Sequence, residues 1–168
     1  MQRTTISFET KPLTECVGLT KSMDRACFPK EMWLSDTEMC MLLQMEAEAT
    51  ILRHDNIEIG QAITIPENAA AIILDGVDEY FRINEGGVYS YSEAIIPGYQ
   101  NKGYGALLLS EIAIRMRQRG FTSISAHVRT RYGWNKRRGK ELTMHSTRLI
   151  HDFWDDPQEV VQYQSAQL

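Results

Sequence analysis

The 168 residues are 43% apolar and 24% charged, a composition with which one domain can bury its own core. The net charge of −4 combines −8 over residues 1–87 with +4 over residues 88–168, and a basic second half suits an anionic ligand or a solvated basic face. No apolar run approaches the roughly 18 residues of a membrane span and residues 1–12 are too polar for a signal peptide, so a cytoplasmic protein is expected.

The first strand is expected over residues 4–8, where polar and apolar residues alternate. A helix over residues 13–26 stops before Pro29. Ser35 and Glu38 have the spacing of a capping box, which predicts a helix from there to about Ala47. A hairpin follows, with strands over residues 49–53 and 58–65 joined by turn-forming residues.

Residues 69–87 are ambiguous, because an apolar stretch gives way to an acidic one. The clearest strand is residues 88–96, which are rich in Val, Tyr and Ile. It is followed by a helix over residues 103–119, which Gly120 ends, and a strand over residues 122–128. Further elements are a basic, partly helical segment (129–142) and two closing strands (147–153 and 159–164). Residues 1–168 are thus predicted to form a single α/β domain with a mixed central β-sheet flanked by helices.

The three cysteines, Cys16, Cys27 and Cys40, form no CxxC pair and are odd in number. This favours reduced, partly buried thiols over a disulfide framework or a zinc site. No metal is expected.

A glycine-containing turn, Pro97 to Ala106, joins the clearest strand to its helix. Glycines let the backbone approach a ligand closely. The first amides of a helix, which lack intrahelical partners, suit a pyrophosphate. The segment lacks the spacing of a P-loop and of the GxGxxG dinucleotide fingerprint. A GxG at the start of a helix is by itself also typical of a structural turn.

The longer string from Ile95 to Leu108 resembles the acyl-CoA signature of the GNAT superfamily, which has the pattern Gln-x-x-Gly-x-Gly/Ala. The order of strand, loop, helix and strand matches over residues 88–128, and Ala-Cys-Phe-Pro at 26–29 is similar to the family's usual opening. The resemblance implies the GNAT acyl-CoA N-acyltransferase fold and acetyl-CoA as co-substrate. It also implies that loop amides hold the CoA pyrophosphate and that the strand's backbone pairs with the pantetheine arm. The residues implied in this binding are Ile95, Ile96, Gln100, Asn101, Lys102, Gly103, Tyr104, Gly105 and Ala106.

Two residues are candidates for proton transfer. Glu93 lies two residues before Ile95, and the resemblance implies that a glutamate on this strand acts as the base. The alternatives are that Glu93 binds a cationic substrate or has a structural role. Tyr132 is the candidate proton donor, with packing as the alternative, and it stands where many members have Asn. The usual later Tyr is missing, since Gly139 occupies that position. His127 is expected to be a hydrogen-bonded core or edge histidine.

The resulting hypothesis is an N-acetyltransferase in which a primary amine attacks acetyl-CoA directly. The alternative is a non-catalytic acyl-CoA-binding sensor or interaction module with the same fold. The acceptor is a small molecule or a protein or peptide, and the acidic first half favours a cationic one. The basic run over residues 129–140 also fits nucleic acid, which the acidic chain as a whole disfavours. No membrane partner is expected, and the resemblance allows a homodimer.

Overall fold

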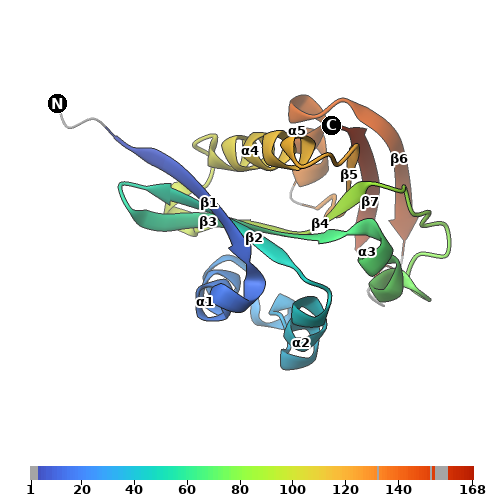
Figure 1. The fold of residues 1–168 in the computed structure, drawn as a ribbon, viewed down its shortest axis with the longest axis horizontal. Coiled ribbons are helices and arrows are strands. Elements are labelled where there is room, and N and C mark those ends of the chain that lie inside the picture. Colours follow the sequence, from blue (N-terminus) through green and yellow to red (C-terminus); the bar gives the residue numbers. More distant parts are fainter. Residues whose placement is uncertain (1–3, 132, 152, 154–158) are drawn as a thin grey trace. The chain divides into compact units, whose positions relative to one another are not determined.

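The computed structural model describes residues 4–131, 133–151, 153 and 159–168. Its strands are hydrogen-bonded in the order β1-β2-β3-β4-β5-β7-β6, as Figure 1 shows. β4 and β5 pair in parallel, while β1 with β2, β2 with β3, β5 with β7 and β6 with β7 are antiparallel. The predicted mixed α/β architecture is therefore confirmed.

The chain forms two compact units: residues 1–65 with 92–111, and residues 66–91 with 112–168. Two elements contribute to both units, namely β4 (Gly87–Ile95) and α4 (Tyr104–Gln118).

In the first unit, the predicted hairpin is formed by β2 (Glu48–His54) and β3 (Ile57–Pro66). β1 (Ile6–Pro12) pairs with β2 on its other side. Asp55 and Asn56 have φ values of 51° and 67°, which is the left-handed backbone of a tight hairpin turn. The turn falls where the sequence predicts it. β1 begins two residues later than predicted and extends to Pro12, since its whole length pairs with β2.

Two helices complete this unit, α1 (Val17–Cys27) and α2 (Asp36–Gln44). A 3₁₀ turn over Leu13–Glu15 precedes α1, so the helix begins later than the apolar spacing predicts. The capping box is confirmed: Glu38 N donates to Ser35 Oγ over 3.1 Å, and Ser35 N donates to Glu38 Oε2 over 2.8 Å. The helix ends at Gln44, before the predicted limit at Ala47.

The second unit contains α3 (Glu67–Leu74), β5 (Ser123–Arg129), α5 (Trp134–Glu141), β6 (Met144–His151) and β7 (Val160–Gln167). The ambiguous region is thus a short helix followed by turns that lead into β4. Both closing strands are confirmed with shifted bounds. The helix in the basic region is also confirmed.

Among the described residues, no helix combines the length and apolar character needed to cross a membrane. Within the same residues, no group of three His, Cys, Asp or Glu side chains is arranged to hold a metal ion. All three cysteines are free: Cys16 is buried, Cys27 is half-buried and Cys40 is exposed.

Candidate functional site

The glycine-containing turn lies in the first unit, between β4 and α4. Its backbone includes Asn101 at φ 60° and Gly103 at φ 88°, a region that favours glycine. A 3₁₀ turn over Pro97–Tyr99 opens the segment, and the Gln100 side chain donates to the Ile95 carbonyl over 2.8 Å. These contacts fix a sharply curved loop directly before the helix.

The N-terminus of α4 is suited to an anion. Leu107 N makes a helical hydrogen bond to Gly103 O over 3.1 Å, so the amides of the three preceding residues, 104–106, come before this bond in the helix. A Cβ added at Gly103 would meet no atom within 4 Å, so the surface there is open. Amides at a helix start, together with the helix dipole, attract phosphate groups.

The predicted donor-binding residues are brought together because they form one continuous segment of the first unit. Ile96 N donates to Ile59 O of β3 over 2.9 Å, which holds the end of β4. Lys102 Nζ donates to Gly98 O over 2.9 Å and lies 5.4 Å from the Tyr99 ring centre. In this structure the ammonium group of Lys102 therefore holds the loop.

Glu93 lies on the half-exposed part of β4. Its neighbours Ser92 and Ala94 line a small pocket, and side chains alternate along a strand, so Glu93 points to the opposite face. Tyr89 has the same parity along β4 and shares that face. The other predicted proton-transfer residue, Tyr132, lies outside the described residues.

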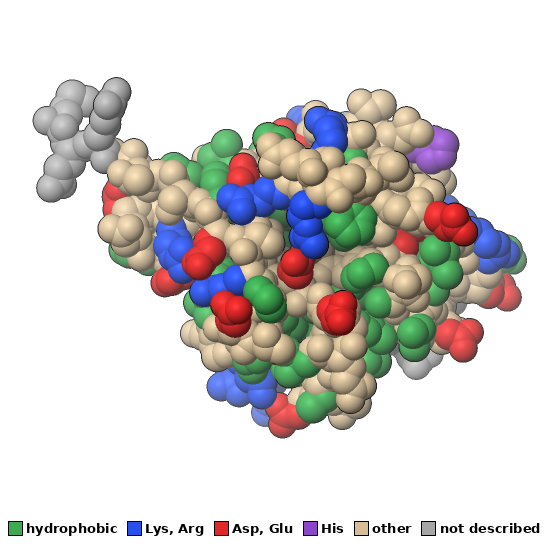
Figure 2. All heavy atoms as spheres, in the orientation of Figure 1, with side chains coloured by type: hydrophobic (Ala, Val, Ile, Leu, Met, Phe, Trp, Pro, Cys, Tyr) green, Lys and Arg blue, Asp and Glu red, His purple; other side chains and the backbone are tan. Residues whose placement is uncertain are grey.

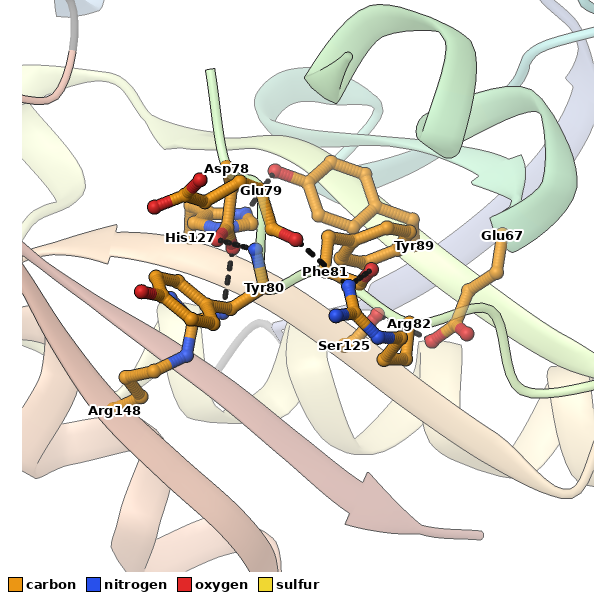
Figure 3. A network of polar contacts seen from close by, with 10 residues as sticks. All are labelled: Glu67, Asp78, Glu79, Tyr80, Phe81, Arg82, Tyr89, Ser125, His127 and Arg148. Carbon is orange, nitrogen blue, oxygen red and sulfur yellow. Dashed lines mark hydrogen bonds and ion pairs between the residues drawn. The ribbon is translucent and has the colours of Figure 1, made fainter. Parts of the chain in front are cut away.

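A chain of hydrogen-bonded polar side chains lies in the second unit, with three buried members and the half-buried Arg148 (Figure 3). Tyr89 Oη is 2.9 Å from His127 Nδ1, and His127 Nε2 is 2.9 Å from Asp78 Oδ2. Arg148 Nη2 donates to the same Asp78 oxygen over 2.6 Å. The His127 and Asp78 side chains are 0% and 1% exposed. The expectation of a hydrogen-bonded histidine is confirmed.

Burial and hydrogen bonding set the charges of this chain. Burial would raise the pKa of Asp78, but hydrogen bonds from Arg148 and His127 outweigh it and lower that pKa. Burial lowers the pKa of His127, although Asp78 partly opposes this. Burial raises the pKa of Tyr89 far above its usual value. At neutral pH the arrangement is thus a neutral imidazole that donates from Nε2 to a carboxylate and accepts from Tyr89.

The chain spans the point where β4 and β5 stop pairing. Their backbone pairs run from Gly87 with Ser123 to Tyr89 with Ser125, while β5 continues to Arg129 along β7. His127 lies two residues beyond the last pair. The hydrogen bond between Tyr89 and His127 therefore links the two strands by their side chains just past their backbone pairing. Tyr89 is thus the member of this hydrogen-bonded chain that lies on β4.

Asp78 and Tyr89 were missed as functional candidates in the sequence. Asp78 lies in the segment of ambiguous structure, and it is 49 residues from His127 and 70 from Arg148. No local spacing rule connects residues so far apart. The usable local signal for this chain is His127 itself, a histidine among the small and apolar residues of β5.

The basic run is partly engaged inside the second unit. Arg129 Nη1 donates to the Glu159 carboxylate over 2.6 Å. Arg138 is 3% exposed, and burial lowers its pKa to about 10. On the face drawn in Figure 2, acidic and basic side chains are interspersed. A nucleic-acid surface is typically dominated by positive charge, so these observations do not favour that role.

Comparison with known proteins follows this geometry. Residues 26–133 match the model of the Acetyltransferase (GNAT) family, a range that includes the glycine-containing turn and His127. No curated protein matches the chain in sequence.

Solved structures match nearly the whole chain. The ribosomal-protein-S18-alanine N-acetyltransferase of Escherichia coli has 12% identity and a TM-score of 0.68, over 97% of this chain and 94% of that one. Naa50 of Arabidopsis thaliana, in complex with the bisubstrate analogue CoA-Ac-MVNAL, has 15% identity and a TM-score of 0.69, over 97% and 99%. A GNAT family acetyltransferase of Elizabethkingia anophelis with acetyl-CoA bound has 14% identity and a TM-score of 0.65, over 97% and 98%. At these identities the likeness is one of fold.

Proposed function

Because the chain belongs to the Acetyltransferase (GNAT) family, we propose that it transfers the acetyl group of acetyl-CoA to a primary amine. The observation that carries this proposal is the turn before α4, where Asn101 and Gly103 have positive φ and the amides of residues 104–106 precede the hydrogen bond from Leu107 N to Gly103 O. The amides of residues 104–106 would bind the pyrophosphate of CoA. The backbone of Ile95 and Ile96 would pair with the pantetheine arm, although the Ile95 carbonyl now accepts from Gln100.

The transfer is a direct attack. The neutral nitrogen of the amine forms a bond to the thioester carbon, the carbon–sulfur bond breaks, and CoA leaves as a thiolate. The ammonium proton passes to a base, and the thiolate takes a proton from an acid or from solvent. We propose Glu93 as the base, as its position on β4 suggests; Tyr132 stays the sequence-based candidate for the acid.

A second route for the proton is supported by the buried chain of the second unit. Through the Tyr89 hydroxyl, His127 could accept a proton, and the ionised Asp78 would stabilise the resulting imidazolium. A histidine whose other nitrogen is held by a carboxylate is suited to this role. The lowered pKa of His127 keeps the imidazole neutral at pH 7, as a base must be.

Calorimetric titration with acetyl-CoA tests the donor site. Wild type is expected to bind in the micromolar range, and Gly103→Glu is expected to lose binding because a side chain there occupies the open surface of the loop. Gly103→Ala is the matched control, since it puts the same strain on the backbone at φ 88° but adds only a Cβ, which meets nothing within 4 Å. A folded wild type that does not bind acetyl-CoA would contradict the donor assignment.

An amine screen that detects free CoA thiol tests catalysis. Thiol release with an amine supports an enzyme, whereas binding of acetyl-CoA without release to any amine supports the sensor alternative. Two of the similar structures are named for a ribosomal-protein alanine as substrate and for a complex with the bisubstrate analogue CoA-Ac-MVNAL. The screen therefore includes peptide N-termini as well as small amines.

A further inference from the structure

Three aromatic rings of the first unit meet beside the glycine-containing turn. His54 is the last residue of β2, Tyr99 ends the 3₁₀ turn, and Tyr104 is the first residue of α4. The ring centre of His54 lies 5.4 Å from that of Tyr99 and 5.6 Å from that of Tyr104, and the two tyrosine rings are 5.9 Å apart. These distances are those of favourable aromatic pairs, so each ring contacts the other two.

The two tyrosines lie at the ends of the part of the turn that has left-handed backbone. Asn101 and Gly103, with φ values of 60° and 88°, both fall between them. Backbone of this kind persists where the surrounding structure holds it firmly. Contacts at Tyr99 and Tyr104 are therefore well placed to keep residues 100–103 in their curved form.

His54 attaches the turn to a different part of the chain. The side-chain hydrogen bonds of Gln100 and Lys102 end on carbonyls of the same segment, so they shape the turn without tying it to other elements. The bond from Ile96 N to Ile59 O holds the chain before the turn begins. His54 reaches both ends of the left-handed stretch from the β2–β3 hairpin.

The hairpin holds His54 in a fixed position. This residue pairs with Ile6 of β1 on one side and with Ile57 of β3 on the other. His54 Nδ1 lies 3.4 Å from Asp55 Oδ2, and the other oxygen of that carboxylate accepts from Thr5 N over 2.8 Å. The imidazole is thus presented to the turn by paired strands, which hold a side chain more precisely than a loop does.

We propose that His54 is a positioning residue for donor binding, which acts by packing against Tyr99 and Tyr104. Residues 100–103 lead directly into α4, so their curvature decides where the amides of residues 104–106 lie. A turn that also samples other conformations binds with an affinity reduced by the fraction that is competent. The inference rests on the proposed acetyl-CoA site for its function, whereas the holding of the turn can be measured without a ligand.

The first experiment removes the ring and then restores one. His54→Ala loses both aromatic contacts, and titration is expected to give it a Kd for acetyl-CoA roughly 5- to 50-fold above that of wild type, the effect of losing two aromatic pairs. His54→Phe keeps a ring at the same position and should bind nearly as well as wild type. In thiol release, His54→Ala should raise the KM for acetyl-CoA and leave kcat unchanged, because saturating donor selects the competent turn.

A double-mutant cycle tests whether His54 acts through the tyrosines. His54→Ala should weaken acetyl-CoA binding by a smaller factor in Tyr104→Leu than in wild type, because one of its two contacts is already missing. Ile57→Ala is the control for the hairpin. It removes a side chain that is 54% exposed from the position paired with His54 and should leave acetyl-CoA binding unchanged.

Hydrogen exchange of the free protein measures the turn directly. Tyr99 N donates to Ile96 O over 2.9 Å and Leu107 N donates to Gly103 O over 3.1 Å, so these two amides report on the two ends of the turn. Both should exchange faster in His54→Ala than in wild type and recover in His54→Phe. The amides of α2 should keep their rates, which separates a loosened turn from general unfolding.

Equal acetyl-CoA binding by wild type and His54→Ala would overturn the proposal, as would unchanged exchange at both amides. A loss of binding in His54→Phe as large as in His54→Ala would overturn it too, and would indicate that the imidazole acts by charge or hydrogen bonding. If His54→Ala does not fold, His54→Leu takes its place, since it fills the space without a ring. If wild type does not bind acetyl-CoA, the donor assignment fails, and the exchange rates alone decide whether His54 holds the turn.

Discussion

The carboxylate of Glu67 occupies the space beside the α-carbon of Gly87. A Cβ built on Gly87 would lie 2.6 Å from Glu67 Cδ and 2.8 Å from Oε2. Glu67 cannot easily move away, because Asn84 N donates to its Oε2 over 2.7 Å and Ser125 Oγ donates to its Oε1 over 2.5 Å. Close approach of the chain entering β4 to α3 therefore requires glycine at position 87.

Gly87→Ala is expected to lower the free energy of unfolding by about 1–3 kcal/mol, the usual cost of overpacking. Chemical denaturation of the purified variant measures this. Gly18→Ala is the control, since Gly18 lies in α1 and an added Cβ meets nothing within 4 Å; it should be neutral or slightly stabilising. Equal stability of Gly87→Ala and wild type would show that Glu67 can move at little cost.

Ser35→Ala should destabilise the protein by about 1 kcal/mol through loss of the N-cap of α2. The substitution removes the acceptor of Glu38 N and leaves that amide without its partner. Thr37→Ala, at an exposed position in the first turn of the same helix, should change the unfolding free energy by less than about 0.5 kcal/mol. The denaturation midpoints of the two variants are compared with that of wild type. Equal midpoints for Ser35→Ala and Thr37→Ala would contradict a stabilising role of the N-cap.

Stability should fall as the pH drops below about 6.5, through His127. Its pKa in the folded state lies below the usual 6.5, so the unfolded chain binds the proton first and unfolding is favoured as pH falls toward the folded pKa. The slope from this group cannot exceed about 1.4 kcal/mol per pH unit. His127→Asn should therefore flatten the curve of unfolding free energy against pH. Burial raises the pKa of Glu67, and protonation of this group makes the folded state more stable as the pH falls. That contribution is present in both wild type and His127→Asn, so it does not affect their comparison.

The two proton routes differ in the pH dependence of catalysis. If His127 accepts the proton through Tyr89, kcat/KM should fall on the acidic side, below pH 6.5, and Tyr89→Phe should lower kcat at least about tenfold. His127→Asn should remove that acidic limb, while Glu93→Gln should keep it.

If Glu93 is the base, the outcomes reverse: Glu93→Gln loses most turnover while acetyl-CoA binding stays intact. Tyr89→Phe retains the ring and its packing, so a loss of stability without a change in the pH profile would indicate a structural role for the chain of hydrogen bonds.

Local signals account for the parts of the fold that the sequence predicts well. The capping box at Ser35, the turn at residues 54–56 and Gly120 after α4 depend on neighbouring residues alone, and each is found where expected. The glycine-containing turn belongs to the same class, because the residues predicted to bind the donor form one continuous segment. Bounds are less certain, as the 3₁₀ turn before α1 shows: apolar spacing does not distinguish it from the helix proper.

Partners distant in sequence account for what the sequence does not predict. The contacts of His127 come from the segment after α3, from β4 and from β7, through Asp78, Tyr89 and Tyr163, and only pairing of the strands brings these together. His54 likewise resembles any turn-forming residue until its contacts with the two tyrosines of the glycine-containing turn are known. Residues 69–87 are ambiguous because Glu67 and Asp78, which anchor them, bond to strands that appear later in the chain.

The three thiols differ enough in environment to be distinguished chemically. Burial raises the pKa of Cys27 to about 11 and also raises that of Cys16, so both are mostly protonated and unreactive at pH 8. Cys40 is exposed on α2. A maleimide fluorophore should consequently attach at one position, which gives the unaltered protein an optical reporter on a helix of the first unit.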